Sequence, residues 1–360
     1  MYTMNDMVGN NRLIITEYSR LVKYMQAESL LLKAGIEIDG VDKNTHGFRL
    51  AANKKVLGII KKLDFKINSS KDVENIAGIS THSYRRIDDI IKNGRLSELD
   101  NTYTRDMKDK IKGIQDLFDV HGLGPAAVKK MVTKDGIHNL EQLCRAVENG
   151  SITLNRKAML GLKYFDVQKK KIPRQETTNI MKFLKKNLGK IDKKFVLEIC
   201  GSYRRGKKFS GDIDVLIYHP DVKTLRKFSA DHNGYLKKFV KLLRNANYIV
   251  DDITDGNISK KYMGYAKYKA YDTRRIDIQF VPYESRFSAL LYFTGPHQLN
   301  DYMRLQAKKR DMRLNEYGIY KGRDVDIEKA RPMKATSEKT FFDILGMKYL
   351  EPKEREIYNN

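Results

Sequence analysis

Apolar residues recur at intervals of three and four through the first half of the chain, which is the spacing of one face of an α-helix. The first block with this spacing runs from about residue 11 to 91, and a second runs from about 104 to 164. We therefore expect helices over both blocks, broken where glycine or proline interrupts the pattern. The interrupting residues are Gly35, Gly40 and Gly47 in the first block and Gly122, Gly124, Pro125 and Gly150 in the second.

The pattern changes to short strand-like runs after Pro173, which marks a joint between two regions. The runs span residues 195–200, 213–218 and 276–281, and a helical stretch from Tyr235 to Leu243 lies between the second and the third. Helices followed by a region of strands and helices predict an α+β protein. We expect an all-helical amino-terminal part and then a domain built on a mixed sheet with helices.

The charge of the chain indicates a polyanionic partner. Its 360 residues include 69 Lys and Arg against 45 Asp and Glu, a net charge of +24. Lysines also stand beside tyrosines, at Lys261-Tyr262, Lys267-Tyr268-Lys269 and Lys348-Tyr349. Such pairs suit phosphate contact and base stacking. An acidic membrane surface is the competing partner, but the sequence has no long basic amphipathic helix. We therefore expect a nucleic acid and no membrane.

Several classes of protein are excluded by what the sequence lacks. Cys144 and Cys200 form no C-x-x-C pair, so neither a disulfide framework nor a cysteine-ligated zinc site is expected. No apolar run approaches the ~18 residues of a membrane span, and the first residues carry no secretory signal. We expect a reducing intracellular compartment, with nucleus and cytoplasm equally open. The composition, rich in Lys, Asn, Ile and Tyr, is compatible with an AT-rich genome, a viral one included.

The most informative segment is GSYRRGKKFSGDID at residues 201–214, directly before an apolar run. Asp212 and Asp214 are two residues apart at the start of a strand, so both point to one face. Two adjacent carboxylates repel unless a cation lies between them, and oxygen ligands of this kind suit Mg²⁺. Asp277 stands on a later strand between two isoleucines, and the alternation turns it to the polar face. Three carboxylates on adjacent strands can hold two metals that clamp an attacking and a leaving oxygen.

The same segment carries groups that suit a phosphate. Backbone N–H groups and the hydroxyl at Gly201-Ser202 can face a phosphate, and Arg205 supplies positive charge. For an isolated Asp-x-Asp, a solvated strand opening would be the better interpretation. Gly-Ser, an arginine and Gly-Asp-x-Asp within one short segment favour a nucleotide-binding site instead.

This segment matches the nucleotidyltransferase signature, and the chain resembles the family X DNA polymerases of the beta type. Further matching motifs are RRIDI at 274–278, LYFTG at 291–295, NEY at 315–317, SEK at 337–339 and EPKER at 351–355. The resemblance covers about residues 15 to 357. It implies a template-directed, gap-filling polymerase of base-excision DNA repair. Such an enzyme transfers a nucleotide from a deoxynucleoside triphosphate to a primer 3′-hydroxyl and releases pyrophosphate.

The resemblance assigns catalysis and metal binding to the three aspartates. Asp212 and Asp214 would bind both of two Mg²⁺ ions, for which Mn²⁺ can substitute. Asp277 would bind the catalytic ion and take the proton of the primer 3′-hydroxyl. Arg275 would contact the primer backbone, and Arg304 the template strand. The implied nucleotide-binding residues are Lys171, Ser202, Arg205, Ser210, Gly211, Tyr292, Phe293, Gly295 and Asn300.

Three positions depart from the family pattern. Lys171 stands where a triphosphate-binding arginine is usual, and it lacks the planar fork of that side chain. Gln279 replaces an arginine that in relatives pairs with the second metal-binding aspartate, and His297 replaces an aspartate that lies against the incoming base. These differences concern closure and nucleotide selection rather than the chemistry. The family bends the chain after LYFTG through a cis bond, and because proline follows here we expect a cis Gly295–Pro296 peptide.

Two glycine-containing turns resemble helix-hairpin-helix motifs. The segment VHGLGPAAVKK at residues 120–130 also fits a dinucleotide-binding turn, but its helical surroundings favour a hairpin that grips a DNA phosphate. Residues 76–83 resemble a poorer first copy, with Ser80 in place of the second glycine. The implied DNA contacts are Gly78, Ile79, Gly122, Gly124 and Lys129. The same resemblance implies K⁺ or Na⁺ on the backbone carbonyls of Ile76, Ile79, Phe118, Val120 and Leu123.

Beta-type enzymes also have a 5′-deoxyribose-phosphate lyase activity, which needs a lysine amine to form a Schiff base. The position of that lysine falls on Arg86, whose guanidinium has no lone pair to offer. His82 stands where a phosphate-binding lysine is usual, so we expect weak or absent lyase activity. The residues expected to keep a 5′-phosphate pocket are Lys43, Arg49, His82 and Arg86. The alternative is a relocated nucleophile, at Lys54, Lys55 or Lys92.

The resemblance divides the chain into four parts. Residues 1–103 would form a lyase-like helical domain, 104–173 a DNA-binding helical subdomain, 174–283 the catalytic palm and 284–360 a nucleotide-selecting subdomain. The partners would be gapped or nicked DNA and a deoxynucleoside triphosphate, with the protein a monomer. A template-independent nucleotidyltransferase and a catalytically dead DNA-binding scaffold stay open as alternatives. Template-independent relatives carry a long loop after the aspartate pair, and the short segment at residues 219–227 favours a template.

Overall fold

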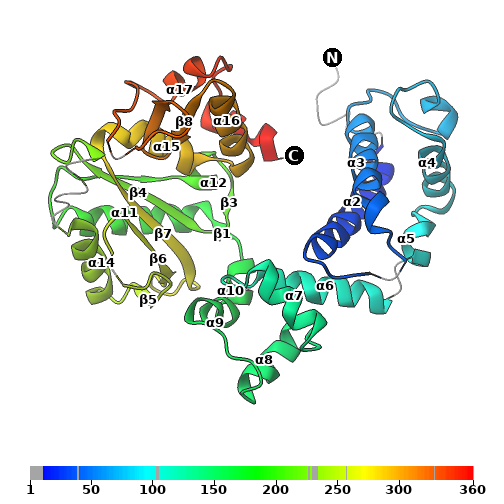
Figure 1. Cartoon of the computed structure of the whole chain (residues 1–360), viewed down its shortest axis with the longest axis horizontal. Helices are drawn as coiled ribbons and strands as arrows, with labels where there is room; N and C mark the ends of the chain where they lie inside the picture. The colour runs from blue at the N-terminus through cyan, green and yellow to red at the C-terminus, as the bar shows by residue number, and fades with distance from the viewer. Residues whose placement is uncertain are drawn as a thin grey trace. The chain divides into compact units, whose positions relative to one another are not determined.

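The chain folds into two compact units, Met1–Leu162 and Lys163–Asn360. A computed structural model describes residues 11–359 except 39, 103–104, 226–227, 229–233, 257 and 328. The first residues, where we expected no secretory signal, and Arg226 and Lys227 of the short loop lie outside the described residues. Figure 1 shows helices throughout the first unit and a sheet with helices in the second, so the expected α+β class is confirmed. No helix in the described part of the chain is long and apolar enough to cross a membrane.

The first unit is helical, as the spacing predicts. Its elements are α2 (Arg12–Lys33), α3 (Lys43–Ile60), the 3₁₀ turn η1 (Ser70–Val73), α4 (Thr81–Asn93), α5 (Ser97–Thr102), α6 (Arg105–Asp119), α7 (Pro125–Thr133), α8 (Leu140–Glu148) and α9 (Arg156–Lys163). Helix α3 begins after Asp42, whose carboxylate accepts a hydrogen bond from the N–H of Asn44 at 2.9 Å, a common N-cap. The expected break at Gly47 is wrong, because buried residues at 46, 50, 53 and 57 continue the helical spacing past it.

The second unit is built on a five-stranded mixed sheet in the order β2-β4-β7-β6-β5. The strands are β2 (Val196–Ile199), β4 (Ile213–His219), β5 (Ile249–Asp252), β6 (Lys261–Ala266) and β7 (Arg274–Pro282). Strands β4 and β7 are parallel, and the other pairs are antiparallel. The helices are α10 (Phe165–Lys169), α11 (Arg174–Leu188), α12 (Gly201–Arg204), α14 (Tyr235–Asn245), α15 (Arg286–Thr294), α16 (His297–Lys309) and α17 (Lys339–Ile344).

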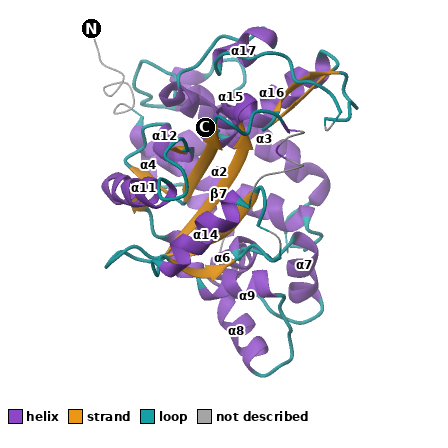
Figure 2. Cartoon of the chain, turned by 90° about the vertical axis from the view of Figure 1, so that its left-hand side faces the viewer, coloured by secondary structure: helices purple, strands orange, loops and turns teal. Residues whose placement is uncertain are grey.

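The two faces of the sheet pack against different helices. Ile213 and its alternate neighbours on β4 lie in one core with apolar residues of α11 and α14, and Figure 2 shows α14 lying across the strands. On the opposite face, Leu216 packs with Ala289 of α15. Because side chains alternate along a strand, Asp214 shares the α15 face with Leu216. The strand pattern therefore turns Asp214 away from α11 and α14, toward the end of α15.

The carboxy-terminal part forms a core of its own after β7. It contains the 3₁₀ turn η2 (Tyr283–Ser285), the hairpin β8 (Met312–Asn315) and β9 (Gly318–Lys321), and a final 3₁₀ segment η3 (Pro352–Asn359). Phe341 and Phe342 of α17 are buried together with residues of α15, α16 and β9. Helices α15 and α16 meet at Gly295–Pro296, whose peptide bond is cis, as the sequence predicts.

Candidate active site

The parallel pairing of β4 and β7 brings the aspartates together. Asp214 and Asp277 are direct register partners, and Asp212 immediately precedes β4. Ile276 and Ile278, on either side of Asp277, are fully buried on the helix-covered face. The three carboxylates that the sequence singles out therefore meet on the opposite face of the sheet.

The guanidinium of Arg275 bridges two of these carboxylates. Its Nη2 donates to Asp212 Oδ2 at 2.5 Å, and its Nη1 donates to Asp277 Oδ1 at 3.0 Å. Burial alone would lower the pKa of Arg275, but the carboxylates of Asp277 and Asp212 outweigh it and raise that pKa. The resemblance assigns Arg275 to the primer backbone. In this structure it is the counter-ion of the aspartates.

The remaining carboxylate repulsion is visible at Asp214. Burial raises its pKa well above the ordinary range, and the charges of Asp212 and Asp277 add to the effect. Burial also raises the pKa of Asp277, although Arg275 opposes it. Further positive charge between these groups would relieve the repulsion.

Oxygen donors of this kind fit a hard divalent cation such as Mg²⁺. Arg275 already demonstrates that the carboxylates of Asp212 and Asp277 accept a shared cation. Within the described ranges, no three His, Cys, Asp or Glu side chains already surround a common metal position. A metal ion between Asp212 and Asp277 would compete with Arg275 for their oxygens.

The turn after β2 is shaped by the close approach of Gly201 to Asp214. Gly201 has φ of 54°, and a Cβ there would overlap the Oδ2 atom of Asp214, so only glycine allows this backbone. The N–H of Cys200 donates to the carbonyl of Asp214 at 2.8 Å, which fastens the turn to β4. Ser202 and Arg205 follow directly and lie beside the aspartates.

A short ladder brings Lys171 to Ser210. Strand β1 (Ile172–Pro173) pairs with β3 (Phe209–Ser210), and Ile172 lies opposite Ser210. Lys171, directly before β1, therefore lies close to Ser210 and Gly211. The hydroxyl of Ser210 is buried and has no hydrogen-bond partner among the described residues. Buried hydroxyls are normally bonded, so Ser210 carries an unsatisfied polar group next to Gly211.

A cavity of about 390 Å³ lies in front of the aspartates. Its lining includes these residues from the sequence prediction: Ser202, Arg205, Asp212, Asp214, Asp277, Tyr292, Phe293, Gly295 and Asn300. His297, one of the departures from the family pattern, lines it as well. The predicted residues that do not line it are Lys171, Ser210, Gly211, Arg275 and Arg304.

Sequence reasoning missed three residues of the cavity wall, Lys261, Thr294 and Gln298. Thr294 directly precedes the cis peptide and Gln298 follows two residues after Pro296, so their closeness in the chain to Gly295–Pro296 was the available signal. Lys261 comes from β6, where it lies opposite Gln279 of β7. The sequence indicated Lys261 only as half of a Lys-Tyr pair, because β6 was not identified.

The wall formed by α15 and α16 is held by side-chain contacts. Asn300 Nδ2 donates to the carbonyl of Tyr292 at 2.8 Å. The guanidinium carbon of Arg304 lies 5.0 Å from the centre of the Tyr292 ring, so Arg304 acts on the cavity through that ring. His297 is 80% exposed, with its Nε2 3.0 Å from Asp301 Oδ2. His297 therefore stands at the open rim.

The two hairpin turns of the first unit have matching backbones. Gly78 and Gly122 have φ of 102° and 97°. Ser80 and Gly124 precede α4 and α7 with φ of −104° and −89° and nearly equal ψ. Ser80 therefore occupies the position of the second glycine without strain, because no positive φ is needed there. In each turn one carbonyl predicted for a monovalent cation accepts a backbone hydrogen bond, at Ile76 and at Val120.

Arg86 is held by fixed partners. Its Nε and Nη2 donate to the two carboxylate oxygens of Glu98 at 2.6 and 2.7 Å, and its Nη1 donates to Asn53 Oδ1 at 2.9 Å. A hollow of about 250 Å³ lies beside it, with His82 on its wall. Lys43, Arg49 and the alternative nucleophiles Lys54, Lys55 and Lys92 do not line this hollow. Lys55 instead reaches the first hairpin turn, where it lies against Gly78.

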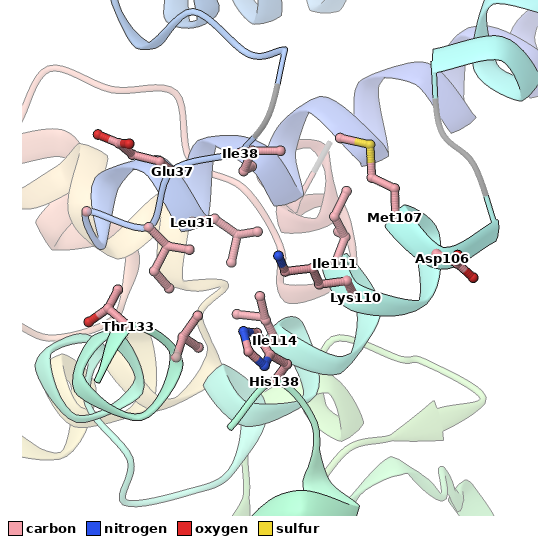
Figure 3. Close-up of a pocket in the computed structure, with 13 residues that line it drawn as sticks. Leu31, Glu37, Ile38, Asp106, Met107, Lys110, Ile111, Ile114, Thr133 and His138 are labelled. Carbon is pink, nitrogen blue, oxygen red and sulfur yellow. The ribbon is translucent and has the colours of Figure 1, made fainter. Parts of the chain in front are cut away.

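A larger cavity, of about 700 Å³, lies elsewhere in the first unit (Figure 3). Its walls combine apolar side chains of α2, the segment after it, α6 and α7 with the polar residues Glu37, Asp106, Lys110, Thr133 and His138. None of the residues predicted for catalysis, nucleotide binding or DNA binding lines it. Its size alone therefore does not make it the candidate active site.

Comparisons with known proteins match both the sheet domain and the chain as a whole. A family model of the DNA polymerase beta palm matches residues 171–283, and one of the DNA polymerase beta thumb matches residues 289–356. DNA polymerase lambda of Arabidopsis thaliana is 32% identical over 319 residues, which are 84% of this chain and 57% of that protein. DNA polymerase lambda of Rattus norvegicus is 27% identical over 86% of this chain and 52% of its own length.

A third similar protein, the DNA nucleotidylexotransferase of Gallus gallus, is 24% identical over 84% of this chain and 62% of that protein. The chain thus spans little more than half the length of the curated relatives it matches.

Proposed function

The chain belongs to the DNA polymerase beta family, family X, and we propose that it is a template-directed DNA polymerase that fills short gaps during base-excision repair. One observation supports this proposal above the others. Asp214 and Asp277, in register on β4 and β7, face the same cavity as Ser202 and Arg205. A hydroxyl and a guanidinium that suit phosphate thus line the same cavity as the carboxylates, which supports transfer of a nucleotide to a primer.

The aspartates are proposed to act at the reacting atoms. Polymerases of this family depend on divalent metal ions, and two Mg²⁺ ions held by Asp212, Asp214 and Asp277, with Mn²⁺ as a substitute, would neutralise charge on the α-phosphate and on both oxygens of an in-line displacement. Asp277 takes the proton of the primer 3′-hydroxyl as that oxygen attacks. Arg275, displaced from the carboxylates, becomes available to the primer phosphate.

The remaining groups position the nucleotide. Lys171, Ser202, Arg205, Ser210 and Gly211 hold the triphosphate, and the unbonded hydroxyl of Ser210 supports this role. Tyr292, Phe293 and Gly295 line the sugar, and Asn300 reaches the base edge. Holding both reactants in line accounts for a large share of the acceleration in such enzymes.

The helical unit is proposed to bind gapped or nicked DNA. The two matching turns, with Gly78 and Ile79 in one and Gly122, Gly124 and Lys129 in the other, bind DNA phosphates, each with K⁺ or Na⁺ on its carbonyls. In this proposal, residues 1–103 bind the 5′-phosphate side of the gap and residues 104–173 bind the duplex. Residues 174–283 form the catalytic palm, and residues 284–360 select the nucleotide. We propose that the protein acts as a monomer.

Primer extension on gapped DNA with Mg²⁺ and deoxynucleoside triphosphates tests this function. A template-independent transferase would extend a single-stranded primer as well as a gapped one, and the Gallus gallus relative is named a DNA nucleotidylexotransferase. A catalytically dead scaffold would bind gapped DNA and extend nothing. The proposal expects efficient extension at a gap and little on the single strand.

A further inference from the structure

Two adjacent arginines at the end of α12 are each bound by a glutamate from the last part of the chain. Arg204 donates to Glu338 at 3.0 and 2.6 Å. Arg205 donates from Nε to Glu356 Oε1 at 2.5 Å and from Nη1 to the carbonyl of Thr294 at 2.6 Å. The turn proposed to bind the triphosphate is therefore held from two carboxy-terminal positions.

The Arg204 pair is part of the folded core. Glu338 is 7% exposed and also accepts a hydrogen bond from Arg355, whose side chain is fully buried. Arg355 donates in addition to the carbonyl of Leu350 at 3.1 Å. Glu338 therefore does not exchange Arg204 for another partner, because its release would leave buried charges unpaired.

The Arg205 pair lies at the edge of the active-site cavity instead. Arg205 lines that cavity, and the side chains of Arg205 and Glu356 are 12% and 22% exposed. Glu356 Oε2 also lies 2.7 Å from the amine of Lys207, which is 49% exposed. Its neighbour Arg355 anchors η3, so Glu356 is held where it can reach both cations.

We propose that Glu356 competes with the triphosphate of the incoming nucleotide for Arg205 and thereby raises the KM for nucleotide. This inference rests on the proposed function and names a residue to which the resemblance gives no role. A guanidinium offers five N–H donors in a fixed fork, and Glu356 and Thr294 already engage two of its nitrogens. The other N–H groups remain for a phosphate, so Glu356 competes mainly through charge: while paired, its carboxylate neutralises the guanidinium and repels the triphosphate.

Glu356 loses little when Arg205 leaves it for the triphosphate. Once Arg205 turns to the triphosphate, the carboxylate keeps the ammonium group of Lys207 as a partner and stays partly in water. No buried charge is left unpaired, in contrast to the Arg204 pair. The contact therefore sets nucleotide affinity without being needed for the fold.

The test is steady-state extension by the full chain on gapped DNA with Mg²⁺, comparing Glu356→Gln with the unaltered protein. We expect the KM for the complementary deoxynucleoside triphosphate to fall by about three- to tenfold, the effect of weakening one charge-assisted bond. The kcat should stay within about twofold, because Glu356 touches no reacting atom. Glu354→Gln is the matched control, since Glu354 lies on the same segment and its carboxylate accepts the N–H of Glu351 at 2.8 Å. It should leave the KM unchanged.

A double mutant separates competition from general charge. Arg205→Ala alone should raise the KM, and in that background Glu356→Gln should no longer lower it. The proposal is overturned if Glu356→Gln lowers the KM equally in the Arg205→Ala background, or if Glu356→Gln alone raises the KM. If thermal melting shows that Glu356→Gln is unfolded, Glu356→Asp, which keeps the charge but shortens the reach to Arg205, must lower the KM instead. Absence of any extension by the unaltered protein would contradict the proposed function and not this contact.

Discussion

Asp214 on β4 and Asp277 on β7 are register partners across two parallel strands. The pairing brings together residues that are far apart in the sequence, on the face of the sheet that α11 and α14 leave uncovered. Burial at this place raises the pKa of Asp214, and the neighbouring charges of Asp212 and Asp277 raise it further. The relationship therefore determines both where the site lies and why it requires cations.

Replacement of Asp277 should separate chemistry from DNA binding. Asp277→Ala removes a metal ligand and the proton acceptor, so we expect nucleotide addition to fall by at least about 10³-fold. Binding to gapped DNA should change only a few-fold, because phosphate contacts elsewhere carry it. Extension rates and fluorescence anisotropy measure the two effects. Asp272→Ala, which removes an exposed carboxylate paired with Lys170, is the control, and near-normal extension by Asp277→Ala would refute the assignment.

Adjacent arginines on β7 should behave differently toward Mg²⁺. Arg275 neutralises the aspartates that are proposed to bind metal. Arg275→Ala should lower the free energy of unfolding by about 1–3 kcal/mol in a chelator, and Mg²⁺ should restore much of that loss. Chemical denaturation with and without Mg²⁺ measures this. An equal loss under both conditions would contradict the proposal that Arg275 and the metal alternate at the same carboxylates.

Arg274 provides the comparison. Its Nε and Nη2 donate to Glu176 of α11 at 2.7 and 2.9 Å, and both side chains are buried. Arg274→Ala leaves Glu176 buried without its partner, so we expect a loss of about 3–5 kcal/mol in the free energy of unfolding. The loss should be the same with and without Mg²⁺. A smaller loss with Mg²⁺ than without it, relative to the unaltered protein under the same condition, would show that the metal effect is not specific to Arg275.

The protein should form little covalent adduct in a lyase assay. The guanidinium of Arg86 is engaged by Glu98 and Asn53 and offers no nucleophilic lone pair. We therefore expect little borohydride-trapped adduct on an incised abasic site, with alkaline cleavage of the same DNA confirming that the site is present. An efficient adduct mapped to Lys54, Lys55 or Lys92 would establish a relocated nucleophile.

Much of the site could be predicted because its residues lie in short, local motifs. Asp212, Asp214 and Asp277 stand at strand positions whose alternation fixes the face on which they lie. The first hairpin turn could be recognised despite Ser80, because the backbone there needs no glycine. The resemblance then supplied roles that spacing alone does not contain.

The missed features depend on partners that are distant in the sequence. Strand β5 is the four residues IVDD and β6 is KYMGYA, so neither has a clear apolar alternation and Lys261 at the start of β6 went unrecognised. Arg205 and Glu356 are 151 positions apart in the chain, so no local sequence pattern indicates that they pair. Gly47 misled the prediction because a glycine in a helix lowers its stability without ending it.

Single-nucleotide incorporation on a one-nucleotide gap tests the central claim most directly. Each deoxynucleoside triphosphate is supplied alone, with Mg²⁺, opposite each of the four template bases. If the aspartate site performs templated transfer, one nucleotide is added and the complementary one is strongly preferred opposite every base. Addition of the same nucleotides whatever the template, or no addition under conditions in which gapped DNA is bound, would contradict the account.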